Sequence, residues 1–258
     1  MKPEIGVFSF TGCEGCQLNI LNLEAYLLDL LDVIEIVNFR EAMTEKGQDY
    51  AIAFVEGSIT TPEDEKELKE IREIADVLVA IGACAHLGGV NGMKQLRDLE
   101  TQRREVYGDK KDFFPTTEVR RVSDVVPVDL IIPGCPIDRN EFVETVKKVL
   151  MGIPPMLPTN PCCVECKSKG NVCMYDKGLS CLGPVTRGGC DAICPSYGQP
   201  CDGCRGFLET ADFDAMVKAM ENEHGISTEA IIRQISHYNA VPAADLIAKL
   251  KAREVIHA

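Results

Sequence analysis

Residues 4–16 read Glu-Ile-Gly-Val-Phe-Ser-Phe-Thr-Gly-Cys-Glu-Gly-Cys, an apolar run that ends in a turn rich in glycine and cysteine. Such a run predicts a buried β-strand, and a helical pattern follows it over Leu18–Leu31. Short apolar runs and helical patterns continue to alternate as far as residue 150. This alternation predicts an α/β fold, in which a parallel sheet carries helices on both faces.

The same patterns give the bounds of the other elements. The predicted strands are Glu4–Phe10, Val33–Asn38, Ala51–Glu56, Val77–Ile81 and Leu130–Ile132. The predicted helices are Leu18–Leu31, Pro62–Ile74 and Arg139–Leu150, and Pro62 suits an early helical position. The polar segment Gly88–Val126 is only weakly periodic, so we expect an irregular excursion with one helix.

Four prolines fall between Pro154 and Pro161, where no regular element can continue. We therefore expect two domains, residues 1–155 and 156–258. Residues 162–206 hold nine of the thirteen cysteines and few large apolar side chains, so metal must supply the folding energy of this small irregular part. The tail Asp212–Ala258 is helical in pattern, with breaks at Gly225 and Asn239–Pro242, and we expect its helices to pack on the cysteine-rich part.

Composition restricts the function. A formal charge of -13 and a pI near 4.8 argue against nucleic acid and anionic membranes as partners, so we expect protein partners. No apolar run approaches the roughly 20 residues of a membrane span, and the first predicted strand leaves no room for a leader. A cytoplasmic location without direct membrane insertion is therefore expected. Thirteen cysteines in such a protein indicate metal ligation rather than disulfides.

A first group of cysteines follows three predicted strands: Cys13, Cys16, Cys84 and Cys135. In an open parallel sheet the carboxyl ends of the strands meet at one edge, where ligands bind. Four thiolates converging from three loops suit one cubane iron–sulfur cluster. In the alternative reading, Cys84 and Cys135 are core thiols, and Cys13 with Cys16 forms a redox pair or half a zinc site.

A second group occupies the cysteine-rich stretch, and it contains eight ligands for two sites: Cys163, Cys166, Cys173, Cys181, Cys190, Cys194, Cys201 and Cys204. Cys162 is the cysteine left over, because Cys163 forms the C-x-x-C pair with Cys166, and we expect its sulfur to point elsewhere. Two zinc sites would need the same number of thiolates. The Cys194-Pro195 step and the additional site in the first domain favour iron–sulfur clusters.

Taken in order, these motifs resemble the small subunit of nickel-iron hydrogenases: Thr-Gly-Cys-Glu-Gly-Cys at 11–16, Val-Glu-Gly at 55–57, Gly-Ala-Cys at 82–84, Pro-Gly-Cys-Pro at 133–136 and Cys-Leu-Gly-Pro-Val-Thr-Arg-Gly-Gly-Cys at 181–190. The resemblance implies a flavodoxin-like first domain whose proximal cluster is held by the first group. It implies medial and distal clusters in the second domain, hence three [4Fe-4S] clusters in total. It also implies that no dihydrogen-cleaving residue lies in this chain, because the nickel-iron centre sits in a separate large subunit.

Within that family the chain is similar to the cytoplasmic NADP-linked hydrogenases, also called sulfhydrogenases, and to the heterodisulfide-reductase-associated type. We favour the first, which implies diaphorase-type partner subunits with flavin and iron–sulfur groups. The deazaflavin-coenzyme-reducing type fits less well, because the chain lacks its repeated ferredoxin run. The cluster subunit of respiratory complex I shares the first domain but has a tandem Cys-Cys where this chain has Cys13-Glu-Gly-Cys16. A zinc-stabilised scaffold is the alternative outside these redox families.

Overall fold

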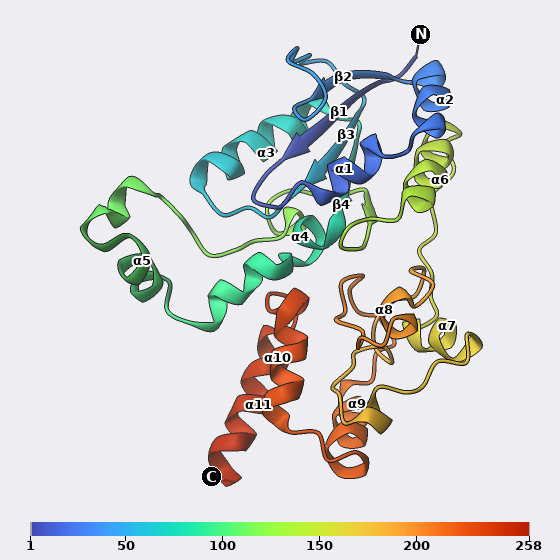
Figure 1. The fold of residues 1–258 in the computed structure, drawn as a ribbon. Coiled ribbons are helices and arrows are strands. Elements are labelled where there is room, and N and C mark those ends of the chain that lie inside the picture. The colour runs from blue at the N-terminus through green and yellow to red at the C-terminus, as the bar shows by residue number, and fades with distance from the viewer. Residues whose placement is uncertain (1, 258) are drawn as a thin grey trace. The chain divides into compact units, whose positions relative to one another are not determined.

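A computed structural model describes residues 2–257, which form two compact units that divide after Pro155. One parallel sheet forms the centre of the first unit (Figure 1). Its strands are β1 (Glu4–Ser9), β2 (Glu35–Phe39), β3 (Ile52–Glu56), β4 (Val77–Ile81) and β5 (Leu130–Ile132). They lie in the order β2-β1-β3-β4-β5. Flavodoxin-like folds have this order, so the predicted α/β class is confirmed.

Helices cover both faces of the sheet, because side chains alternate between the faces along each strand. Ile52 and Phe54 of β3 belong to a core shared with α1 (Gly15–Leu21), α2 (Ala25–Val33) and α6 (Arg139–Leu150). Ala53 and Val55, one residue along, belong to a second core with α3 (Pro62–Ile74). Figure 1 shows α3 on one side of the sheet and α1 with α6 on the other.

Local sequence explains where α3 begins. The Thr61 hydroxyl accepts a hydrogen bond from the Asp64 N–H at 3.0 Å, and the Asp64 carboxylate accepts one from the Thr61 N–H at 3.0 Å. This reciprocal capping, with Pro62 in the first turn, satisfies donors that a helix leaves open. The predicted bounds of α3, α6, β4 and β5 are confirmed.

The single helix predicted over Leu18–Leu31 is wrong. The chain forms α1 and α2, separated at Glu24, whose φ of 53° interrupts the helical backbone. Leu23 is buried beside this break, at 4% exposure, so the apolar periodicity continues although the helix does not. Helix α2 also takes up Val33, which was predicted to begin the second strand.

The predicted irregular excursion contains one α-helix, α5 (Leu99–Tyr107), among short turns of tighter helix, as expected. These turns are η1 (Gly89–Leu96), η2 (Gly108–Phe113) and η3 (Val122–Asp124). A further short helix, α4 (Gly82–Leu87), was not predicted. It begins directly where β4 ends and carries Cys84.

The second unit has short helical pieces in its cysteine-rich part and longer helices after it: α7 (Cys162–Ser168), η4 (Tyr175–Lys177), α8 (Ile193–Ser196), α9 (Phe213–Lys218), η5 (Ala219–Glu223), α10 (Thr228–Asn239) and α11 (Ala244–His257). The breaks predicted near Gly225 and after Asn239 are confirmed. Helix α10 contacts the cysteine-rich loops, because the Asn239 side-chain amide donates to the carbonyl of Gly203 at 3.1 Å. Among residues 2–257, no helix combines the length and apolar character that crossing a bilayer requires.

Candidate metal centres

The first group of cysteines meets at one small cavity in the first unit. Its volume is about 60 Å³, and all four thiols line it: Cys13, Cys16, Cys84 and Cys135. Each follows the carboxyl end of a strand or begins the helix after it, as the topology requires. The structure thus brings together the four residues that sequence reasoning grouped.

Glycines leave room for the sulfurs at this cavity. A Cβ on Gly82 would lie 2.4 Å from Cys16 Sγ, and one on Gly89 would lie 2.9 Å from Cys84 Sγ. Both glycines have positive φ, 81° and 56°, which other residues adopt only with strain. The backbone is therefore shaped around the thiols, and the donor set fits a soft metal centre such as an iron–sulfur cluster.

A buried carboxyl group, that of Glu56, supports the loop that carries the first pair of thiols. It is 2% exposed and accepts hydrogen bonds from the N–H groups of Cys16 and Gln17, each at 3.1 Å. Glu56 is thus a hydrogen-bonding carboxyl group that positions Cys16 and the first turn of α1. These bonds join residues about 40 positions apart, so only the folded chain reveals them.

Burial at the cavity favours the neutral forms of the Cys16 and Cys84 thiols. Burial raises the pKa of Cys16 above its usual range, and the nearby Glu56 adds to the effect. Burial, with contributions from Cys135 and Cys13, raises the pKa of Cys84 to about 12. A metal centre that binds here must displace the protons of these thiols. Its positive charge then offsets the repulsion between the thiolates.

In the second unit, one set of thiols gathers around the beginning of α7: Cys163, Cys166, Cys173 and Cys181. A Cβ on Gly183 would lie 3.0 Å from Cys163 Sγ and 3.6 Å from Cys181 Sγ, so both sulfurs face this glycine. Burial raises the pKa of Cys163 to about 11, with contributions from Cys166, Cys173 and Cys201. The four residues therefore form one candidate ligand set.

The remaining thiols form a neighbouring set. Burial raises the pKa of Cys194, with contributions from Cys201 and Cys190. Cys204 is partly exposed and lies in the turn after Cys201. The Cys201 N–H donates to Cys181 Sγ at 3.2 Å, so a direct hydrogen bond connects the two sets.

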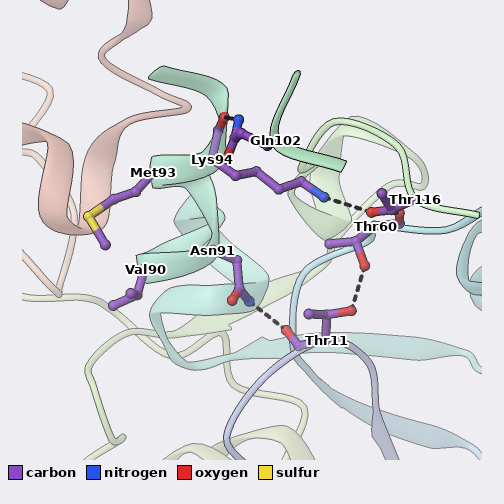
Figure 2. A pocket seen from close by; sticks show the side chains of 8 residues that line it. All are labelled: Thr11, Thr60, Val90, Asn91, Met93, Lys94, Gln102 and Thr116. Atoms are coloured by element: carbon purple, nitrogen blue, oxygen red, sulfur yellow. Dashed lines mark hydrogen bonds between the residues drawn. The ribbon is translucent and has the colours of Figure 1, made fainter. Parts of the chain in front are cut away.

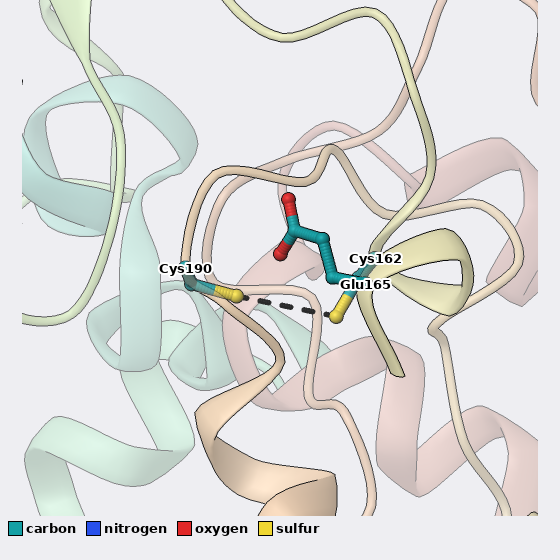
Figure 3. Close-up of side chains that lie close together, drawn as sticks. All are labelled: Cys162, Glu165 and Cys190. Carbon is teal, nitrogen blue, oxygen red and sulfur yellow. Dashed lines mark hydrogen bonds between the residues drawn. The ribbon is translucent and has the colours of Figure 1, made fainter. Parts of the chain in front are cut away.

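Cys162, predicted to be the cysteine left over with its sulfur pointing elsewhere, lies beside this second set. It is buried, at 1% exposure, and its Sγ is 4.0 Å from Cys190 Sγ (Figure 3). The hydrogen bond between them lowers the pKa of Cys190 and raises that of Cys162. Successive helical residues are rotated by about 100°, so Cys162 and Cys163 at the start of α7 face different sets.

Glu165 is a residue of this site that sequence reasoning missed. One oxygen of its carboxylate and the sulfurs of Cys162 and Cys190 all lie within 4.8 Å of one another, as Figure 3 illustrates. The carboxylate accepts hydrogen bonds from the N–H groups of Gly189 and Ala192, on either side of Cys190. Its position between the predicted ligands Cys163 and Cys166 is the feature of the sequence that could have identified it.

A separate polar pocket of about 490 Å³ lies in the first unit (Figure 2), lined by Thr11, Thr60, Val90, Asn91, Met93, Lys94, Gln102 and Thr116. Its polar groups bond to one another: the Asn91 amide donates to the carbonyl of Thr11 at 2.9 Å, and Lys94 Nζ donates to the Thr116 hydroxyl at 2.8 Å. Burial lowers the pKa of Lys94. The lining includes no thiol, so this pocket is distinct from the candidate metal sites.

Comparison with protein families gives a match over residues 13–149 to the NADH ubiquinone oxidoreductase 20 kDa subunit. The matched region includes the whole first group of cysteines and stops before the second. The match therefore concerns the sheet unit and its site.

Comparison with individual proteins extends the likeness to the second unit. The delta subunit of sulfhydrogenase 2 from Pyrococcus furiosus is 41% identical over 79% of this chain and 86% of its own length. A subunit of the F420-non-reducing hydrogenase vhu from Methanocaldococcus jannaschii is 33% identical over 98% of this chain and 99% of its own. A crystal structure of an NAD+-reducing [NiFe]-hydrogenase in the H2-reduced state aligns with a TM-score of 0.56 at 25% identity, covering 61% of this chain and 96% of that one.

Proposed function

Since this chain belongs to the family of the NADH ubiquinone oxidoreductase 20 kDa subunit and, within it, to the small subunits of nickel-iron hydrogenases, we propose that it carries electrons through three [4Fe-4S] clusters. The dihydrogen-splitting site would lie on a separate large subunit. The observation that carries this proposal is the convergence of four thiols on one cavity at the carboxyl edge of the sheet.

The proposed proximal cluster takes its ligands from the first unit: Cys13, Cys16, Cys84 and Cys135. Three separate loops present these thiols, and Glu56 holds the loop of Cys16 through two backbone hydrogen bonds. The space that Gly82 and Gly89 leave for the sulfurs supports this assignment. When bound, a cubane cluster supplies one-electron transfer, and the protein adjusts its potential through hydrogen bonds, burial and charge.

The other two clusters would be held in the second unit. We assign one to Cys163, Cys166, Cys173 and Cys181, and the other to Cys190, Cys194, Cys201 and Cys204. The position of Gly183 against the sulfurs of both Cys163 and Cys181 supports the first of these sets. The hydrogen bond from the Cys201 N–H to Cys181 Sγ shows that the two ligand sets are neighbours, which supports an electron path between their clusters.

The partners in this proposal are a nickel-iron large subunit and diaphorase-type subunits that carry flavin and iron–sulfur groups, with NAD or NADP as the acceptor. The likeness to an NAD+-reducing [NiFe]-hydrogenase supports this acceptor. The relatives include F420-non-reducing enzymes, so the heterodisulfide-reductase-associated type is the alternative. We place the protein in the cytoplasm, because a reducing compartment suits a chain whose cysteines bind metal.

Metal analysis of anaerobically purified protein tests the proposal. We expect about twelve iron and about twelve acid-labile sulfide per chain, from three cubane clusters. Zinc in fully occupied sites would instead support a structural scaffold. No more than about four iron would contradict the three-cluster assignment. Identification of the subunits that co-purify would test the partners and the acceptor module.

A further inference from the structure

The second unit contains nine cysteines, although two four-ligand clusters need eight. The additional residue, Cys162, is not an isolated core thiol. Its sulfur lies 4.0 Å from Cys190 Sγ and within hydrogen-bonding reach of the Cys201 sulfur. Figure 3 shows the sulfurs of Cys162 and Cys190 facing each other. A fifth thiol therefore contacts two members of one proposed ligand set.

Backbone contacts hold Cys162 in this position. Its N–H donates to the carbonyl of Thr186 at 2.8 Å, and the N–H of Cys163 donates to the carbonyl of Gly183 at 3.3 Å. Both acceptors lie between Cys181 and Cys190. The segment that joins the two ligand sets thus fixes the backbone at the start of α7, and the Cys162 side chain is buried there at 1% exposure.

Within this cluster of side chains, Cys162 is the group that can donate a hydrogen. The Glu165 carboxylate already accepts hydrogen bonds from the N–H groups of Gly189 and Ala192. Cys190, as a ligand, would be a thiolate and would accept as well. Cys190 Sγ, at 4.0 Å, is then an acceptor for the S–H of Cys162.

We propose that Cys162 remains a thiol and donates its S–H hydrogen bond to the sulfur of Cys190, which raises the reduction potential of the cluster that Cys190 holds. This inference rests on the proposed function, because it requires a cluster at this set. Reduction adds one electron to the cluster and makes its ligand sulfurs more negative, so the hydrogen bond stabilises the reduced state more than the oxidised one. The proton stays on Cys162 throughout.

The test compares Cys162→Ala with Cys162→Ser in the full chain, purified anaerobically with its partner subunits. The two replacements are similar in size, but only serine keeps a donor. Redox titrations followed by electron paramagnetic resonance measure the midpoint potential of each cluster. For Cys162→Ala we expect one cluster to become about tenfold harder to reduce, which is about 59 mV for one electron. We expect Cys162→Ser to lie between Ala and the parent, and iron content to be unchanged in both.

Iron analysis separates the other outcomes. Loss of about four iron in Cys162→Ala would make Cys162 a ligand and overturn the donor assignment. Unchanged potentials in both variants would reduce Cys162 to a space-filling residue and also overturn it. Either result leaves the three-cluster function intact if the parent holds its clusters. A parent chain that binds zinc instead would overturn the proposed function and this inference together. Cys163→Ala serves as the ligand control, and it should lose iron.

Discussion

Gly82 has a φ of 81° and lies between the end of β4 and Cys84. A side chain here would meet Cys16 Sγ, whereas one on Gly108, whose φ is 55°, would meet no atom within 4 Å. The two positions therefore separate backbone strain from loss of space at the metal site. At the scale of single residues, substitution of these glycines tests the proposed first cluster as directly as substitution of its cysteines.

Substituting Gly82 by alanine should strip iron from the first site, because the added Cβ would occupy space that Cys16 Sγ needs. Gly108→Ala is the control: it should cost about 1–3 kcal/mol of backbone strain and retain iron. Iron content per chain and thermal unfolding measure the two effects. Equal iron retention in both variants would show that the space at Gly82 is not required by a cluster.

Substituting Cys84 by alanine should remove one ligand of the proximal cluster and lower iron content by about four of about twelve atoms. Electron transfer from dihydrogen to external dyes should collapse, while isotope exchange by the large subunit should persist at least in part. Cys162→Ala keeps all the proposed ligands and is the matched control for iron content. Survival of both activities in Cys84→Ala would make Cys84 a core thiol.

At the scale of elements, long-range hydrogen bonds join the ends of helices and strands. Glu56, the last residue of β3, accepts from the first turn of α1. Asp129, just before β5, accepts from the N–H of Leu78 at 2.7 Å and from Arg72 of α3. Each carboxyl group connects elements that are far apart in the sequence. Glu56 therefore helps to order the carboxyl edge of the sheet, and Asp129 helps to order the amino ends of β4 and β5.

Glu56→Gln should lower the free energy of unfolding of the first unit by about 1–3 kcal/mol, because the amide offers one acceptor oxygen to two backbone donors. Denaturant titration measures the loss, and release of iron from the first site should accompany it. Glu73→Gln, on the exposed side of α3, is the control and should change stability little. Equal stability of the two variants would contradict this role for Glu56.

Asp129→Asn should change how stability depends on pH. Partial burial opposes ionisation, but the N–H of Leu78 and the guanidinium of Arg72 outweigh it and lower the pKa of Asp129 below 3.8. A depressed pKa means that the stabilisation is present above the ordinary value and is lost as the pH falls through the lower, folded value. The stability gap between parent and variant, followed by denaturant titration, should narrow below about pH 4. A gap that is constant with pH would argue against this interaction.

At the scale of the whole molecule, the two units depend on metal to different degrees. The first has two apolar cores, one on each face of its sheet. The cysteine-rich part of the second has short helical pieces of no more than seven residues, joined by loops that carry the thiols. Metal binding contributes most where apolar burial is small. The consequences of cluster loss should therefore differ between the units.

Removing the clusters with a chelator and an oxidant should expose residues 156–206 to protease, while a fragment that ends near Pro155 survives. The sheet should keep its far-ultraviolet circular dichroism, because its cores do not require metal. Protein with its clusters intact is the control and should resist cleavage. Equal cleavage rates before and after metal removal, or loss of the first unit as well, would contradict this division.

The sequence by itself determined most of the elements and brought together the first group of candidate ligands. Alternation of apolar runs and helical patterns is a local property, so the strands, α3 and α6 could be read from it. The position of cysteines after strands followed from topology, since parallel strands end at one edge. Residues 162–206 hold nine cysteines and few large apolar side chains, and this composition likewise indicated metal.

The tertiary structure alone decided features that depend on residues distant in sequence. The break between α1 and α2 lies within a continuous apolar pattern, and burial of Leu23 accompanies it. The contact between Cys162 and Cys190 spans 28 positions, and spacing within the C-x-x-C pair could not reveal it. Short-range patterns report on local backbone preferences, whereas the partner of a buried polar group is set by which loops the folded chain brings together.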